Sequence, residues 1–233
     1  MANNKNQGAV DLNETLNKSE AFFNKYKKPI IIALAAIIVL IVGLFLYKSY
    51  VSGPRENKAS TALAKGQEYF MAEKYDVALN GDSTSFAGFA KLAKQYSGTK
   101  AGNLANLYAG LCYANLDKWE DAVKFLDAYT PASDQMVGPA ATAALGNAYA
   151  HIGQTDKAVN LLKKAAEKAD KEAANNTNNS ISPTFLLQAG EILESEGKKD
   201  EALKLYKSIK EKYVNSPLIQ TGEVDKYIER ATR

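Results

Sequence analysis

Two side chains that could do chemistry, His151 and Cys112, are each the only residue of their type in this 233-residue chain. A Ser-His-Asp or Cys-His-Asn centre would have to use His151 as its base. A zinc site needs four ligands, drawn mainly from Cys and His. Neither residue lies in a nucleophile-elbow or zinc-spacing motif, so we interpret His151 as a residue at a helix end. Cys112 is interpreted as a small buried hydrophobic side chain.

Paired carboxylates are the other candidates for chemistry. Glu194 with Glu196, and Asp200 with Glu201, lie near predicted turns and helix starts, where acidic side chains are usually solvated. The sequence contains neither the phosphate loop GxxxxGKS/T nor the dinucleotide fingerprint GxGxxG. The net charge of +3 is too small for a nucleic-acid footprint. The sequence therefore predicts no enzyme activity, no cofactor, no metal and no nucleic-acid partner.

The elements that hold these residues repeat along the chain. In four stretches a Gly precedes an Ala by twelve residues, a Tyr or Leu follows the Gly by three, and an acidic residue precedes the Ala by two. The stretches are GQEYFMAEKYDVA from Gly66, GLCYANLDKWEDA from Gly110, GNAYAHIGQTDKA from Gly146 and GEILESEGKKDEA from Gly190. This pattern predicts helical hairpins, because small residues let two antiparallel helices approach closely. One hairpin cannot bury its apolar face alone, so neighbouring hairpins must stack.

The spacings between the four Gly residues are 44, 36 and 44. A helix–turn–helix unit of about 34 residues explains them if loops are inserted near residues 80–88 and 172–182. The pattern resembles the tetratricopeptide repeat, and the resemblance covers roughly Ala59 to Val214. We expect irregular repeats over 59–215. A capping helix should follow over 216–233, where Ser216 and Pro217 start it.

An apolar run of 18 residues, Ile30 to Tyr47, contains no charge. As a helix it would span roughly 27 Å, close to the thickness of a bilayer core. It predicts a transmembrane helix over 29–50, preceded by a cytoplasmic tail over 1–28 and followed by a linker over 51–58. A cleaved signal peptide is the competing interpretation, but its apolar region is normally shorter. The residues chosen to represent the anchor are Ile30, Ile38, Val39, Leu46 and Tyr47.

The predicted fold class is thus all-α, with one N-terminal transmembrane helix and an irregular helical-hairpin solenoid. A basic-ended tail, one span and irregular repeats in this order resemble the bacterial YfgM-like family. That resemblance implies an inner-membrane protein with a periplasmic repeat domain, ancillary to the SecYEG translocon. Its implied partners are translocon subunits, the membrane-anchored periplasmic chaperone PpiD and nascent secretory chains. The alternative is a cell-envelope and division scaffold of the Tol–Pal-associated type, although no coiled coil precedes the repeats.

A protein that acts by binding would use the surface formed by the first helices of the hairpins. In stacked hairpins these helices line a concave groove that accepts a peptide or a partner helix. Helical spacing selects ten candidate groove residues, with the alternative that the leucines belong to the core between repeats. They are Leu104, Leu107, Leu111, Asn115, Ala143, Asn147, His151, Leu187, Glu191 and Ser195.

Overall fold

A computed structural model describes residues 12–82 and 84–233, and all the regular secondary structure in these ranges is helical. The predicted all-α class is therefore confirmed. The chain forms two compact units with their boundary between Pro54 and Arg55, and each is described separately. Residues 1–11 of the predicted tail lie outside the described residues.

The first unit contains helix α1 (Leu12–Tyr47) and a short π-helix, η1 (Lys48–Ser52). Its apolar stretch is long enough to cross a membrane, and none of it is buried within the protein. Ile38 and Val39, two of the predicted anchor residues, are 60% and 70% exposed. Pro29 lies inside α1, where it removes a backbone donor. Length and composition are thus compatible with a single membrane span.

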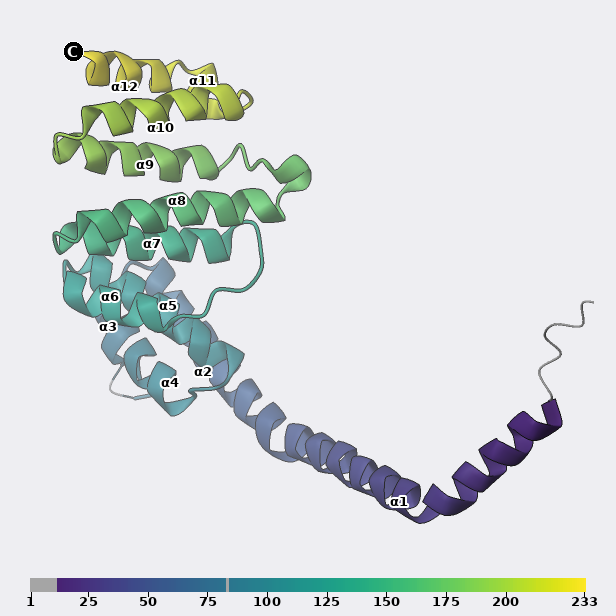
Figure 1. Cartoon of the computed structure of the whole chain (residues 1–233). Coiled ribbons are helices and arrows are strands. Elements are labelled where there is room, and N and C mark those ends of the chain that lie inside the picture. Colours follow the sequence, from purple (N-terminus) through teal and green to yellow (C-terminus); the bar gives the residue numbers. More distant parts are fainter. Residues whose placement is uncertain (1–11, 83) are drawn as a thin grey trace, which may run out of the picture. The chain divides into compact units, whose positions relative to one another are not determined.

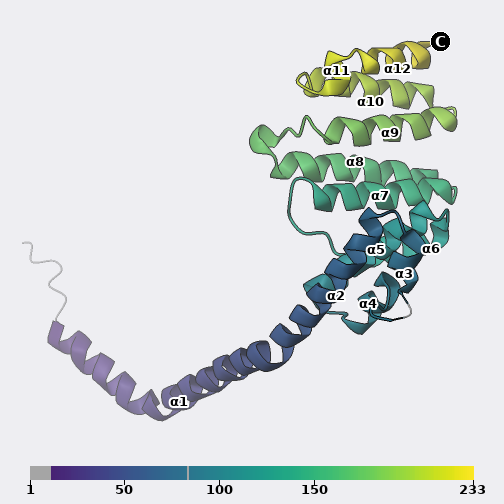
Figure 2. The same ribbon diagram turned by 180° about the vertical axis from the view of Figure 1, so that it is seen from behind.

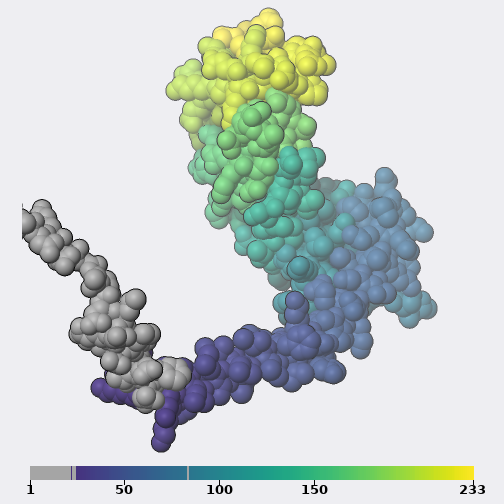
Figure 3. Space-filling model, turned by 90° about the vertical axis from the view of Figure 1, so that its right-hand side faces the viewer, coloured from purple at the N-terminus to yellow at the C-terminus, as the bar shows by residue number. Residues whose placement is uncertain are grey.

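The second unit is a stack of helical hairpins that follow one another in chain order (Figures 1 and 2). The colours of Figure 3 pass from teal to yellow as successive bands, because each hairpin packs on the next. Helix α2 leads into this unit from the first. The helices are α2 (Gly53–Met71), α3 (Tyr75–Asn80), α4 (Phe89–Gln95), α5 (Lys100–Asn115), α6 (Trp119–Ala128), α7 (Val137–His151), α8 (Thr155–Glu172), η2 (Ala174–Asn176), α9 (Ser182–Ser195), α10 (Lys199–Lys212), α11 (Pro217–Gln220) and α12 (Glu223–Thr232).

The turns of the four hairpins share one backbone conformation. The residue seven positions after each repeat Gly has a positive φ: 58° at Glu73, 54° at Asp117, 75° at Gly153 and 74° at Gly197. This left-handed conformation ends the first helix and reverses the chain. Four copies of one backbone feature at one register show that the four stretches are structural repeats.

The repeat glycines mark close contacts between helices. A Cβ atom built on Gly110 would lie 2.6 Å from Leu126 Cγ, and one on Gly190 would lie 2.3 Å from Tyr206 Cε1. Leu126 and Tyr206 each stand four residues after the repeat Ala of their own hairpin.

In the first repeat, other residues pack against the repeat glycine, Gly66. Asp82 stands four residues after its repeat Ala, and helix α3 ends just before that position. Phe86 of the insertion and Phe89 just after it pack on Gly66 instead. Aromatic residues from beyond the hairpin thus replace the large residue that its second helix lacks.

Two predicted boundaries differ from the structure. Residues 51–58, expected to form a linker, are helical, since they contain the end of η1 and the start of α2. Gly53, between η1 and Pro54, keeps helical angles (φ −62°, ψ −54°), so the helix continues from η1 into α2, and the fixed φ of Pro54 is compatible with it. The expected capping helix over 216–233 is two helices, α11 and α12. Gly222, with φ 69°, separates them.

Candidate functional site: an apolar groove between α5 and α7

The first helices of the second and third hairpins carry almost no charge. Helix α5 has one charged residue, Lys100 at its start, and α7 has no Asp, Glu, Lys or Arg. Their hairpin partners, α6 and α8, are rich in charged residues. The surface that α5 and α7 form together is therefore uncharged over most of its length.

A groove of about 430 Å³ opens between these two helices. Its volume lies within the range of ~300–1,000 Å³ that is usual for ligand pockets. Met136 and Val137 at its edge are 50% and 51% exposed, which is unusual for large apolar side chains. The lining residues are Phe70 of α2, Leu107, Tyr108 and Leu111 of α5, and Met136, Val137, Ala140, Ala141 and Ala144 at and within the start of α7.

A carboxylate fixes the edge of the groove at the start of α7. Asp134 Oδ1 accepts hydrogen bonds from the backbone N–H groups of Met136 at 2.8 Å and Val137 at 2.5 Å. Its other oxygen accepts one from the N–H of Gly138 at 3.0 Å. An acidic group at a helix start satisfies free donors and complements the helix dipole. Asp134 therefore holds Met136 and Val137 at the rim although both are exposed.

An aromatic cluster forms the other wall. The ring of Tyr108 stacks on Phe89, with centroids 5.0 Å apart, and meets Phe70 edge-on at 5.2 Å. Its hydroxyl accepts a hydrogen bond of 2.8 Å from Gln67 Nε2 of α2. Phe89 in turn meets Phe86 edge-on at 5.6 Å. Tyr108 is thus held from three sides, and its position depends on the insertion that contains Phe86.

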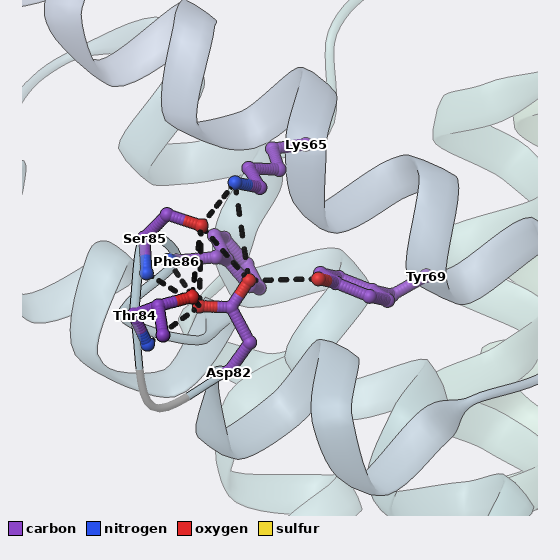
Figure 4. A network of polar contacts seen from close by, with 6 residues as sticks. All are labelled: Lys65, Tyr69, Asp82, Thr84, Ser85 and Phe86. Carbon is purple, nitrogen blue, oxygen red and sulfur yellow. Dashed lines mark hydrogen bonds and ion pairs between the residues drawn. The ribbon is translucent and has the colours of Figure 1, made fainter.

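Asp82 organises that insertion (Figure 4). Its carboxylate accepts hydrogen bonds from the backbone N–H groups of Ser85 at 2.6 Å and Phe86 at 2.8 Å. The Tyr69 hydroxyl donates to it at 2.7 Å. The Ser85 N–H, the Tyr69 hydroxyl and the Phe86 N–H hold the pKa of Asp82 far below its usual value. The carboxylate therefore stays charged and fixes the loop that carries Phe86.

Two of the ten predicted groove residues line this groove, Leu107 and Leu111. Leu104 is half-buried between the cores of two hairpins. Ala143 and Leu187 are buried in the core of the last hairpins, so the prediction that they line a groove is not met. Ala143 and Leu187 lie on the faces of α7 and α9 that pack against neighbouring helices. For Leu187 this agrees with the alternative that the leucines belong to the core between repeats.

The five polar candidates lie outside the groove. Asn147 Nδ2 approaches Gln188 Oε1 of α9 at 3.4 Å. Asn115 donates to the Leu111 carbonyl and Ser195 to the Ile192 carbonyl, each in its own helix. Glu191 and His151 are exposed. None of these five is among the residues that line the groove.

Cys112 is fully buried, as the sequence predicted. Burial in an apolar environment raises the pKa of its thiol to about 12. The thiolate is the reactive form, so this cysteine is a packing residue.

A sequence profile described as "Tetratricopeptide repeat-like domain" matches residues 20–221. The chain belongs to the tetratricopeptide repeat-like domain family. The predicted resemblance to this repeat is thereby confirmed, while no curated protein matches the chain.

Solved structures resemble this tetratricopeptide repeat protein in fold. The TPR-like repeats of a Podosopora anserina protein described as a putative kinesin light chain have a TM-score of 0.55 and 15% identity, covering 76% of this chain and 86% of that one. A variant of the same repeats has a TM-score of 0.51 and 15% identity, covering 76% and 94%. The structure of MamA has a TM-score of 0.49 and 17% identity, covering 72% and 92%. At such low identity the first two likenesses show the fold alone.

Tetratricopeptide repeats are typically scaffolds that bind other proteins and do not catalyse reactions. The groove fits that role, since its lining is mainly apolar surface and the Tyr108 phenol is its one ionisable group. The sequence did not predict the other seven lining residues, which are Phe70, Tyr108, Met136, Val137, Ala140, Ala141 and Ala144. Met136 and Val137 could have been noticed as adjacent apolar residues between a capping Asp and a helix start.

Proposed function

We propose that this protein is a membrane-anchored adaptor that binds an uncharged, apolar segment of a partner protein between α5 and α7. The observation that carries the proposal is the groove of about 430 Å³ with half-exposed Met136 and Val137 at its rim. Burying such side chains on binding contributes roughly 25 cal/mol for each Å² of apolar area removed from water.

The lack of charge selects the class of partner segment. A charged peptide would lose hydration in this groove without gaining an opposite charge, because the lining residues include no ionisable group apart from the Tyr108 phenol. An amphipathic helix with a row of apolar side chains, or an extended apolar segment, has no such penalty. Met136 and Phe70 could contact partner segments of different sequence, because a Met side chain adapts its shape and an aromatic ring packs against many apolar groups.

We further propose that the partner belongs to the Sec translocon. In this proposal the chain is a single-pass protein of the bacterial inner membrane with its N-terminus in the cytoplasm. Its repeat domain stands in the periplasm beside a membrane-anchored chaperone and meets emerging secretory proteins. The order of anchor and irregular repeats supports this role. Apolar segments exposed by chains that have not yet folded also match the groove in chemistry.

The test is crosslinking in cells. A photoreactive amino acid is placed at Met136 or Val137 in the groove, and at Lys204 or Lys207 on the exposed face of α10 as a control. The proposal expects the groove positions, and not the control positions, to capture translocon subunits, the chaperone or secretory chains. Capture of outer-membrane or peptidoglycan-linked proteins instead would favour the Tol–Pal-type scaffold.

A matched pair of variants separates binding from folding. Ala140 and Thr184 both stand six residues before the repeat Gly of their hairpins and are both exposed, but only Ala140 lines the groove. Both positions lie in the first turn of a helix, where an added Asp is tolerated. Ala140→Asp should abolish the groove crosslinks and Thr184→Asp should leave them, with similar melting temperatures. Equal crosslinking by both variants would overturn the groove as the binding site.

A further inference from the structure

A basic corner lies where the second unit begins. We define it as Arg55 and Lys58 at the start of α2, Lys91 and Lys94 on α4, and Lys100 at the start of α5; all five are exposed. Residues 83–116 of the sequence contain Lys91, Lys94 and Lys100 and no Asp or Glu. With Glu56 between Arg55 and Lys58, the corner holds five basic side chains and one acidic side chain, in a chain whose acidic and basic residues are nearly balanced in number.

Side chains of α2 hold the parts of this corner together. The Arg55 guanidinium donates hydrogen bonds to the carbonyl of Gln95 at 2.9 Å and that of Ser97 at 3.2 Å. The Glu56 carboxylate accepts hydrogen bonds from the N–H groups of Lys100 at 2.7 Å and Ala101 at 2.9 Å. The Glu56 carboxylate is thus occupied by backbone donors, and the lysine side chains remain available.

A polar cleft of about 460 Å³ adjoins Lys100. Its walls carry hydroxyl and amide groups, and no acidic residue lines it. The free N–H groups at the start of α5 are already taken by Glu56 and by Thr99 Oγ1, which accepts from Gly102 at 2.9 Å. An anion at this corner would therefore be held by lysine side chains, with polar neighbours. The lining residues are Ser97, Gly98, Thr99, Lys100, Gly102, Asn103, Asn106, Ala128 and Thr130.

The short segment between the apolar run and the basic corner determines which anionic groups lie close to the corner. Only residues 48–54 separate Tyr47, the last residue of the apolar run, from Arg55 in the basic corner. These residues are helical, in η1 and the start of α2, so eight residue steps rise at most about 12 Å. If the apolar helix spans a membrane, the basic corner cannot leave the neighbourhood of the lipid headgroups.

We propose that the basic corner binds the phosphate groups of anionic phospholipids and so fixes the orientation of the repeat stack at the membrane surface. The inference rests on the proposed membrane span but not on the groove or its partner. Each lysine near an anionic surface should raise the equilibrium constant for the bound orientation about fivefold. The attraction should weaken as salt screens it.

The test uses the full chain in nanodiscs. A donor dye is attached at Gln95→Cys, an exposed position beside the corner, and an acceptor is carried by the lipids. The native thiol of Cys112 is fully buried and does not compete for the label. We expect higher energy transfer in discs containing phosphatidylglycerol than in discs of phosphatidylcholine alone, and a loss of this difference at high salt.

The control variants remove equal charge from two places. Lys91→Gln, Lys94→Gln and Lys100→Gln together should abolish the effect of the anionic lipid. Lys199→Gln, Lys204→Gln and Lys207→Gln on α10 should keep it. Equal transfer in both kinds of disc, equal effects of the two triple variants, or the same change produced by free glycerol phosphate would overturn the proposal. A chain that does not insert into discs would overturn the span and this inference with it, whereas the other results leave the span intact.

Discussion

The rings of Trp119 and His151 stack with centroids 3.6 Å apart and planes within 3° of each other. Trp119 begins α6 and His151 ends α7, so the stack joins two successive hairpins at the edge where their turns lie. The only histidine, considered above as a catalytic base or a groove residue, thus has a packing role.

Replacing this histidine should be visible in the fluorescence of the only tryptophan. His151→Ala removes one cover of the indole, so the emission maximum should shift to longer wavelength. An aromatic pair contributes about 0.5–1.5 kcal/mol beyond its buried area, and the free energy of unfolding should fall by that amount. His151→Phe keeps a ring on the indole and serves as the control. An unchanged emission maximum in His151→Ala would show that the two rings do not stack in solution.

The repeat glycines differ in how much space surrounds them. A Cβ on Gly190 would lie 2.3 Å from Tyr206 Cε1, whereas one on Gly146 would meet its nearest atom, the Ala158 carbonyl oxygen, at 3.1 Å. Tyr206 is fully buried, and its hydroxyl donates to Glu194 Oε2 at 2.7 Å, so its ring has little freedom to move.

These distances predict that the same substitution costs more stability at Gly190 than at Gly146. Gly190→Ala should lower the free energy of unfolding by about 1–3 kcal/mol through overpacking. Gly146→Ala needs a shift of only a few tenths of an ångström, and the better helix propensity of Ala offsets it by about 0.5–1 kcal/mol. Denaturant unfolding of both variants measures the difference. A Gly190→Ala variant as stable as Gly146→Ala would contradict the close contact with Tyr206.

The sequence was sufficient to predict the hairpins because their determinants are local. Gly, Ala and the large residue four positions after the Ala recur at fixed spacing, and each marks one helix contact. The first repeat was harder. Asp82 stands where Leu126 stands in the second repeat, so the sequence shows a missing contact but not its replacement. That Phe86 and Phe89 return to fill the space follows from the hydrogen bonds of Asp82, which no periodic pattern reveals.

The groove was predicted only in part for a different reason. Leu107 and Leu187 occupy the same register in their repeats, and both are 6% exposed and part of a core, but only Leu107 also borders the groove, together with Leu111. Which face of a first helix is open depends on how its neighbours are rotated against it. That rotation is set by packing between hairpins and not by spacing within one helix.

Stability at low pH should depend on Asp170. This buried carboxylate accepts hydrogen bonds from Lys212 Nζ at 2.5 Å, Tyr213 Oη at 2.7 Å, Ser182 Oγ at 2.7 Å and the Asn178 N–H at 2.8 Å. Burial alone would raise its pKa, but these four donors outweigh burial and the pKa of Asp170 lies below its ordinary value.

The unfolded chain therefore holds the proton of Asp170 more tightly than the folded protein does. The stabilisation is complete above the ordinary carboxyl pKa of about 4 and is lost as the pH falls toward the folded value. Asp170→Asn keeps the size of the side chain but removes the charge, and should lower the free energy of unfolding at neutral pH by about 3 kcal/mol. Its stability should also fall less steeply below pH ~4 than that of the unchanged protein. Parallel slopes in denaturant unfolding over this range would contradict the assigned role.

The anchor can be tested at the centre of its apolar run. Ile38 and Val39 are exposed on α1, with no core of the protein to receive them. In a bilayer core each arginine costs about 2.5–3.5 kcal/mol, so Ile38→Arg with Val39→Arg should cancel most of the roughly 4–8 kcal/mol that favours insertion. The double variant should leave the membrane fraction on carbonate washing, whereas Ile38→Leu with Val39→Leu should stay. Because these residues belong to the first unit, both variants should keep the thermal unfolding transition of the second. A double arginine variant that resists carbonate would mean that something other than this helix holds the protein at the membrane.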